Sequence, residues 1–273
     1  MNLEDHLGDI IRKGRMIANV SRPAAAQAAG LTEAELSDLE ESGNFSRRPN
    51  FAALGPIIKM EARKLEAIAA GWLPRPPQLK RWQHLRLLVS EGEGMTVNCY
   101  LVWDASTREA ALFDTGFDAQ PILQMVQNER LKLEHIFITH SHEDHVAALG
   151  EIRAASPGVQ VHSHSRHAPA TQRLQAGAQF ALGALKISFR ETPGHAADGV
   201  TYVVSGWPDH APEVAVVGDT VFAGSMGRGN DGWELARNKI REEILSLPPA
   251  TLLCPGHGPL TSVAEERANN PFF

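Results

Sequence analysis

The sequence predicts an α/β protein in which a small all-α domain, residues 1–76, precedes a larger mixed α/β domain, residues 77–273. In the first part of the chain, apolar residues recur at helical spacing between turn signals. Pro74, Pro76 and Pro77 then interrupt any regular structure. Beyond them come short apolar or alternating runs typical of strands, and segments of helix length lie between some of these runs.

The elements of the larger domain can be placed from this alternation. Strands are expected at residues 84–90, 97–103, 109–114, 135–140, 159–164, 184–191, 200–205 and 213–219. Helices are expected within residues 118–130 and 144–155. The chain shows no short-period repeat, so one sizeable core is predicted rather than a repeat array.

The composition argues against several classes of protein. No run of about 18 uncharged apolar residues occurs, and the N-terminus carries charges where a secretory signal would be apolar. We therefore expect a cytoplasmic protein with no membrane partner. The formal net charge of -6 argues against non-specific binding of nucleic acid. Cys99 and Cys254 lie in or beside strand-like runs and are expected to be buried thiols.

Residues 22–43, RPAAAQAAGLTEAELSDLEESG, have the form helix, tight turn at Gly30, helix. They resemble the helix-turn-helix of the Cro/C1 repressor type, over most of residues 8–70. The segment in the position of the recognition helix has no lysine or arginine, and its acids are Glu33, Glu35, Asp38, Glu40 and Glu41. Because DNA affinity needs a positive surface, we expect dimerisation or docking onto the larger domain rather than DNA binding.

The stretch FITHSHEDHVAALG, residues 137–150, places three histidines and two acids directly after an apolar run. The pattern predicts a strand that ends at His140, followed by a turn and a helix. His140 and His142, two apart on extended backbone, point the same way and can bind one divalent ion. Asp144 and His145, at the start of the helix, can turn toward a second ion.

A two-metal site needs further ligands from other strand ends, and His195, Asp219 and His257 each stand at a strand-to-loop transition. The motifs THSHEDH, TPGH, GDTVFAGSMGR and PGHGP resemble those of the metallo-β-lactamase superfamily, in particular its glyoxalase II-like hydrolases. NCYLV, FDTG and NPF extend the resemblance over residues 84–273. It implies an αββα sandwich.

The resemblance also implies two divalent metal ions, zinc first, with iron or manganese as alternatives. The implied ligands are His140, His142 and His195 for one ion and Asp144, His145 and His257 for the other. Asp219 would bridge the two ions. Asp114 of FDTG would support the ligands without binding a metal itself.

Such a site predicts a hydrolase. Two metals about 3.5 to 4 Å apart can share a water, hold it as hydroxide and polarise a substrate carbonyl. Asp144 would orient the hydroxide and carry a proton. A thiolate leaves without a general acid, so a small-molecule thioester or related acyl ester is the expected substrate. In the family, a bridging aspartate such as Asp219 is typical of glyoxalase II, lactonases and nucleases rather than true β-lactamases.

The resemblance places Arg228 where a basic residue meets the carboxylate of glutathione. Only 16 residues follow His257, so we expect no counterpart at this end of the helical region that holds glutathione in glyoxalase II. Among the histidines of VHSHSRH, His164 is expected nearest the pocket.

Two other functions stay open. One is a persulfide dioxygenase, a relative with a single iron, although its usual Gly-Arg-x-Asp loop differs from residues 227–230 here, Gly-Arg-Gly-Asn. The other is a DNA-binding regulator with a ligand-sensing C-terminal domain. A homo-oligomer formed through the N-terminal domain is a further possibility.

Overall fold

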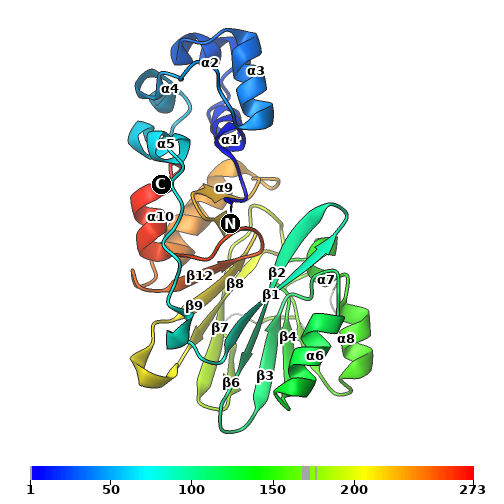
Figure 1. Cartoon of the computed structure of the whole chain (residues 1–273). Helices are drawn as coiled ribbons and strands as arrows, with labels where there is room; N and C mark the ends of the chain where they lie inside the picture. Colours follow the sequence, from blue (N-terminus) through cyan, green and yellow to red (C-terminus); the bar gives the residue numbers. More distant parts are fainter. Residues whose placement is uncertain (1, 168–172, 176) are drawn as a thin grey trace.

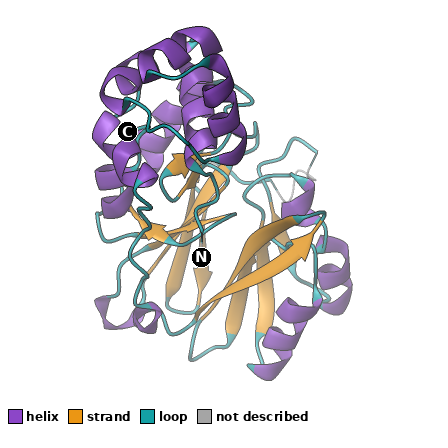
Figure 2. Ribbon diagram, turned by 45° about the horizontal axis from the view of Figure 1, so that its top comes forward, coloured by secondary structure: helices purple, strands orange, loops and turns teal. Residues whose placement is uncertain are grey.

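The computed structural model describes residues 2–167, 173–175 and 177–273. Two β-sheets lie face to face, helices cover the outer face of each sheet, and a further group of helices stands at one end (Figures 1 and 2). The αββα sandwich implied by the sequence is therefore present. No helix within the described residues is long and apolar enough to cross a membrane.

Five α-helices precede the first strand, and every strand of the described residues lies after residue 84. The helices are α1 (Leu7–Ala18), α2 (Arg22–Ala29), α3 (Glu33–Ser42), α4 (Phe51–Ile57), α5 (Ala62–Ala69), α6 (Gln120–Asn128), α7 (Glu143–Val146), α8 (Leu149–Ala155), α9 (Trp233–Lys239) and α10 (Val263–Asn269). The strands are β1 (Leu85–Gly92), β2 (Met95–Trp103), β3 (Glu109–Phe113), β4 (Lys132–Phe137), β5 (Gln160–His162), β6 (Gln179–Leu182), β7 (Leu185–Glu191), β8 (Val200–Ser205), β9 (Val214–Gly218), β10 (Val221–Phe222), β11 (Ser225–Met226), β12 (Leu252–Pro255) and β13 (Thr261–Ser262).

The first sheet has the strand order β1-β2-β3-β4-β5, and β3, β4 and β5 run parallel. Its outer face is covered by α6 and α8, because Leu112 and Ile136 pack in one cluster with Ile122 and Ile152 of those helices. The carboxyl ends of parallel strands share one edge of a sheet. The loops after β3 and β4 therefore meet at that edge.

The second sheet has the order β13-β12-β9-β8-β7-β6, with β9 and β12 parallel neighbours. Between the sheets, Phe137 packs against Tyr202 with ring centroids 5.0 Å apart. The backbone N–H of Gly256, after β12, donates to the carbonyl of Gly218 at the end of β9 (2.9 Å). Gly218 also lies against Thr139, after β4. The ends of both sheets are thereby brought to one place.

The N-terminal helices share a core with the second sheet. Ile10, Leu36 and Leu54 belong to the same buried cluster as Val217 of β9 and Ile240. Figure 1 shows these helices packed on the side that carries α9 and α10. The packing therefore shows that the helical region docks onto the rest of the chain.

The two helices expected around Gly30 are present. Gly30 ends α2 with φ 68°, a left-handed conformation that suits glycine, and Thr32 begins α3 with a capping box. The acidic face of α3 differs from the expectation at one residue. Glu40 is buried and pairs with Arg15 (2.7 Å) and Arg22 (3.4 Å), because it packs between helices instead of facing solvent.

Near the metal-ligand segments, two local boundaries differ from the sequence prediction. The strand predicted to end at His140 ends at Phe137 instead, because the N–H of Thr139 donates to Asp114 (2.7 Å) and not to a neighbouring strand. The helix predicted within residues 144–155 is divided into α7 and α8. Cys99 and Cys254 are free and buried, as expected.

Glu266 provides a pH-dependent contribution to stability in this fold. Its buried carboxylate, on α10, accepts hydrogen bonds from Gly224 N, Thr261 Oγ1 and Asn270 Nδ2, but burial outweighs them and raises its pKa to about 7. The folded state therefore holds a proton that the unfolded state has lost above the ordinary pKa of 4.5. From this group, stability is highest below pH 4.5 and falls as the pH rises to about 7.

Glu266→Gln, which resembles the protonated form, is expected to remove this slope. Between pH 5 and 8 the free energy of unfolding of the wild type should fall relative to the variant by on the order of 2 kcal/mol. Urea unfolding of both proteins at the two pH values measures this difference. An unchanged difference would mean that Glu266 stays ionised in the folded protein.

Candidate metal centre

The seven ligands predicted from the sequence lie together at the shared end of the two sheets. They are His140 and His142 after β4, Asp144 and His145 in α7, His195 between β7 and β8, Asp219 after β9, and His257 after β12. Their donor atoms form three overlapping groups, and within each group the atoms lie within 4.8 Å of one another. Each group has the donor types that zinc and iron accept.

The first group is made of three imidazoles, those of His140, His142 and His195. His142 Nδ1 lies 3.0 Å from His140 Nε2 and 3.1 Å from His195 Nε2. His140 is buried, His195 is partly buried and His142 is exposed, so this group opens to solvent on one side.

The second group joins Asp144 to two buried histidines. Asp144 Oδ2 lies 3.1 Å from His257 Nε2 and 3.3 Å from His145 Nε2. Asp144 comes from the first turn of α7, whereas His257 comes from the loop after β12 on the other sheet.

Asp219 stands between the two groups. Its Oδ1 faces His145 Nε2 at 3.4 Å, and its Oδ2 lies 3.6 Å from His195 Nε2 and 3.4 Å from His257 Nε2. It also forms the third overlapping group, with His140 and His145. One side chain therefore reaches ligands of both sets, as a bridging carboxylate must.

Asp114 holds the second group from behind. Its Oδ2 accepts from His145 Nδ1 (2.8 Å) and from the Thr139 hydroxyl (2.8 Å), and its Oδ1 accepts from the Thr139 N–H (2.7 Å). The backbone of Asp114 has φ 56°, which is uncommon for residues other than glycine, and the residue is almost fully buried. Asp114 thus touches a ligand and lies outside the three groups, which fits the supporting role implied by the resemblance.

The rings of His140, His145, His195 and His257 present Nε2 to the neighbouring ligands, whereas His142 presents Nδ1. His145 Nδ1 donates to Asp114, and His257 Nδ1 donates to the Thr96 carbonyl. His140 Nδ1 is hydrogen-bonded to the Thr139 hydroxyl (3.1 Å). A hydrogen bond at Nδ1 fixes the tautomer that leaves the Nε2 lone pair free for a metal ion.

The histidines of the two groups differ in how readily they carry positive charge. Burial lowers the pKa of His140 well below its ordinary value. Burial also disfavours charge on His145 and His257, but the neighbouring carboxylates outweigh it, so the pKa of His257 rises to about 10 and that of His145 rises as well. For Asp219, the interaction with the same two histidines outweighs burial and lowers the pKa.

Three further observations indicate that the donor set fits divalent ions. Ligand atoms of a tetrahedral ion with bonds of 2.0–2.1 Å lie about 3.3 Å apart, close to the 3.0–3.6 Å contacts found here. His145 Nε2 and Asp219 Oδ1 are buried without a hydrogen-bond partner among the described residues. A Cβ on Gly256 would lie 2.3 Å from Asp219 Oδ1, so only glycine leaves room for this carboxylate.

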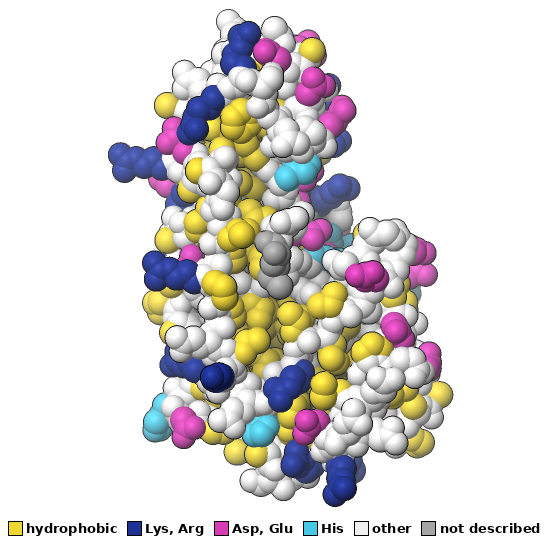
Figure 3. All heavy atoms as spheres, in the orientation of Figure 1, with side chains coloured by type: hydrophobic (Ala, Val, Ile, Leu, Met, Phe, Trp, Pro, Cys, Tyr) yellow, Lys and Arg dark blue, Asp and Glu magenta, His cyan; other side chains and the backbone are white. Residues whose placement is uncertain are grey.

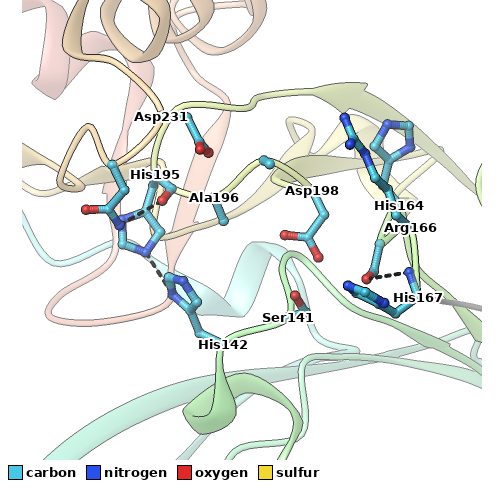
Figure 4. A pocket seen from close by; sticks show the side chains of 12 residues that line it. Ser141, His142, His164, Arg166, His167, His195, Ala196, Asp198 and Asp231 are labelled. Carbon is cyan, nitrogen blue, oxygen red and sulfur yellow. Dashed lines mark hydrogen bonds between the residues drawn. The ribbon is translucent and has the colours of Figure 1, made fainter.

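A cavity of about 430 Å³ opens beside the first group. His142, His195 and Asp231 lie on one side of it, and His164, Arg166 and His167 lie on the other, with Asp198 between them (Figure 4). Figure 3 shows histidine and acidic side chains gathered in the hollow between the helical region and the rest of the molecule.

Sequence reasoning missed three of the cavity residues, Asp198, Asn230 and Asp231. Asp198 follows His195 in the same loop, and Asn230 donates to the His195 carbonyl (2.9 Å), so their nearness to a predicted ligand was the available signal. His164 lines the cavity, as expected. Arg228 does not line it; its side chain lies in a smaller cavity beside α1.

Asp114→Asn is expected to weaken metal binding by about 10- to 100-fold. An amide NH₂ at the position of Oδ2 would face the donor His145 Nδ1–H, so the ring would adopt the tautomer whose Nε2 carries the proton. Competition with a chromophoric zinc chelator measures the affinity. Glu143→Gln, the same change at an exposed neighbour of the ligands, is the control. Equal affinity in both variants would show that Asp114 does not position His145.

Relatives of known description match the part of the chain that carries this centre. The probable metallo-hydrolase YqgX of Bacillus subtilis is 28% identical over 194 residues, 62% of this chain and 89% of that protein. A hydroxyacylglutathione hydrolase of Cereibacter sphaeroides is 33% identical over 60% of this chain, and the match spans 66% of that protein, just under two thirds. The persulfide dioxygenase ETHE1 of Homo sapiens is 31% identical, with coverages of 63% and 69%.

Solved structures show the same fold. The BLEG-1 B3 metallo-beta-lactamase has a TM-score of 0.59 and 28% identity, over 69% of this chain and 98% of that one. ETHE1 of Myxococcus xanthus has a TM-score of 0.60 and 29% identity, over 68% and 83%. TTHA1623, solved in a di-iron-bound form, has a TM-score of 0.56 and 26% identity, over 68% and 100%.

The sequence profile of one family covers most of the larger part of the chain. It matches residues 92–257, and every predicted metal ligand lies within this range. Fold, ligand geometry and profile agree, and the chain belongs to the metallo-beta-lactamase superfamily.

Proposed function

We propose that this member of the superfamily is a dinuclear metal-dependent hydrolase that cleaves a thioester or a related acyl ester. The observation that carries the proposal is the position of Asp219, whose two oxygens face ligands of both groups. In the proposal, the first ion is held by the three imidazoles and the second by Asp144, His145 and His257. Zinc is the expected metal, with iron or manganese as alternatives.

The residues around the ions have distinct tasks. Bound divalent ions supply a water of lowered pKa and polarise the carbonyl of the substrate. Asp144 is partly buried, and its Oδ2 faces His145 and His257. We assign it the role of orienting the attacking water and accepting its proton. The cavity beside His142 and His195 would hold the acyl substrate.

Thioesters suit this arrangement because a thiolate leaves without a proton donor, whereas an amine must be protonated as it leaves. The similarity to a hydroxyacylglutathione hydrolase supports the same choice. Within the described residues the cavity contains no lysine, and its only arginine is Arg166, opposite the metal ligands.

Metal analysis coupled to a substrate screen tests the proposal. The purified protein should contain or bind two divalent ions per chain and should hydrolyse thioesters such as S-lactoylglutathione faster than lactones or phosphodiesters. Treatment with a chelator should abolish the activity, and added zinc should restore it. A metal-loaded protein that hydrolyses none of these substrates would contradict the proposal.

A persulfide dioxygenase is the second candidate, supported by the similarity to two ETHE1 proteins. Asn230 stands where that branch is expected to carry an aspartate, and here its amide donates to the carbonyl of His195. One iron per chain, together with oxygen uptake on glutathione persulfide, would establish this activity in place of the hydrolase.

We further propose that the helical domain comprises residues 1–76 and the catalytic domain residues 77–273. No helix or strand occurs in residues 70–78, which include the three prolines. The negative charge of α3 argues against nucleic acid as a partner. The expected partner is a small-molecule substrate.

A further inference from the structure

The cavity of about 430 Å³ beside the first group contains a carboxylate that has no partner. Asp198 is partly buried, and its Oδ2 is buried without a hydrogen-bond partner among the residues that the structure describes. Asp198 also lies outside the three groups of metal-ligand atoms. Because a buried charge is stable only when it is paired or hydrogen-bonded, this oxygen indicates a site for a donor from outside the chain.

The loop that carries Asp198 is closed by backbone hydrogen bonds. The N–H of Thr192 donates to the carbonyl of Gly199 (2.9 Å), and the N–H of Gly199 donates to the carbonyl of Ala196 (3.0 Å). The N–H of Val200 then donates to the carbonyl of Thr139 (2.9 Å), next to the ligand His140. A carboxylate held on such a loop loses little conformational freedom when it binds a ligand.

Asp198 shares its cavity with two of the metal ligands. His195 stands three residues earlier in the same loop and lines the cavity together with His142. Figure 4 shows Asp198 between these two histidines and the segment that carries His164 and His167. A molecule whose carbonyl lies at the metal centre can therefore reach Asp198 with its other end, inside one continuous space.

The other fully charged side chains of the cavity are exposed. Arg166 lies on the side opposite the metal ligands, and Asp231 lies near His195 (Figure 4). Water screens the charges of Arg166 and Asp231, whereas it does not reach Oδ2 of Asp198. Asp198 therefore has the strongest need for an ion of opposite charge, and a cationic hydrogen-bond donor supplies both the charge and the proton.

From these observations we propose that Asp198 binds a protonated amine of the acyl group and so determines the specificity of the enzyme. The preferred substrate is then a thioester or related ester whose acyl chain carries an ammonium group. The ammonium group donates to Asp198 Oδ2 while the carbonyl lies at the metal centre. This inference rests on the proposed function in taking the cavity to hold the acyl group.

Binding of inert amides tests the site without turnover. One probe is N-(2-acetamidoethyl)-3-aminopropanamide, which carries an ammonium group, and the other is N-(2-acetamidoethyl)butanamide, in which a methyl group replaces it. Each probe is titrated calorimetrically into the metal-loaded full chain. The wild type is expected to bind the ammonium probe about 10-fold more tightly than the neutral probe, the usual effect of one charged hydrogen bond.

Three variants with the same change, aspartate to asparagine, locate the carboxylate that is responsible. In Asp198→Asn the two probes are expected to differ by less than about 2-fold, while the affinity for the neutral probe stays that of the wild type. Asp231→Asn, at an exposed position of the cavity, and Asp209→Asn, at an exposed position outside it, should keep the 10-fold preference.

Equal affinity of the wild type for the two probes, or binding of neither, would overturn the proposal. Loss of the preference in Asp231→Asn but not in Asp198→Asn would also overturn it, because the exposed carboxylate would then be the one that binds the amine. Unchanged affinity for the neutral probe shows that Asp198→Asn is folded, so a lost preference in that variant cannot come from unfolding.

Hydrolysis separates this inference from the proposed function. The 3-aminopropionyl and butyryl thioesters of N-acetylcysteamine differ by the same replacement of ammonium by methyl. The KM of the wild type should be about 10-fold lower for the first, and Asp198→Asn should have equal KM values for both. If the amides bind as expected and neither thioester is hydrolysed, the proposed function is wrong and the amine site stands. Hydrolysis of both thioesters with equal KM values in the wild type would contradict the amine site and leave the proposed function standing.

Discussion

Asp219→Ala is expected to lower the metal content from two ions per chain to one and to reduce hydrolysis by more than about 100-fold. Among the residues that the structure describes, Asp219 is the only side chain whose oxygens face His195 on one side and both His145 and His257 on the other. Without it, the two groups of ligands share no carboxylate. The negative charge of Asp219 also favours the charged forms of the buried His145 and His257, and both would lose this partner.

The measurement combines metal analysis after dialysis with initial rates on S-lactoylglutathione. Asp38→Ala, an exposed aspartate of α3, controls for the loss of one negative charge. Circular dichroism shows whether each variant is folded. Two ions and wild-type rates in Asp219→Ala would refute the bridging role, whereas one ion with wild-type rates would show that the second ion has no part in the reaction.

The metal ligands could be found from the sequence because their signals are local. His140, His142 and His145 stand in one short turn, and His195 and His257 each follow a glycine at a strand end. Their spacing along the chain needs no knowledge of side-chain packing. The alternation of apolar residues gave the strands in the same way, because burial on a sheet has a period of two.

Features that depend on contacts between distant segments could not be read in this way. The end of β4 at Phe137 follows from the hydrogen bond between Asp114 and the Thr139 N–H, and residues 25 apart must fold together before it exists. Nothing in the composition of α3 shows that Glu40 is buried against Arg15. The cavity shared by Arg12 and Arg228 likewise requires the docked position of α1.

Lys13→Met is expected to destabilise the protein by about 3–5 kcal/mol, because it leaves one member of a buried ion pair without its partner. Lys13 Nζ pairs with Asp5 and donates to the carbonyl of Met226 (2.7 Å), and Asp5 also accepts from the Ser225 hydroxyl. Lys13 and Asp5 are both buried. Met fills a similar volume, so the cost arises from charge and not from a cavity. Thermal unfolding should show a melting temperature lowered by roughly 10 °C.

The double variant Asp5→Leu/Lys13→Met separates the ion pair from its surroundings. Removing both charges leaves no buried ion unpaired, so the double variant should be more stable than Lys13→Met alone. If the single and double variants lose the same stability, the carboxylate of Asp5 must already be neutral or hydrated in the folded protein. Because Met226 precedes the loop that touches His195, the single variant should also bind zinc more weakly than the wild type, even at temperatures where both are folded. Unchanged zinc affinity would mean that α1 stabilises the fold without positioning the metal centre.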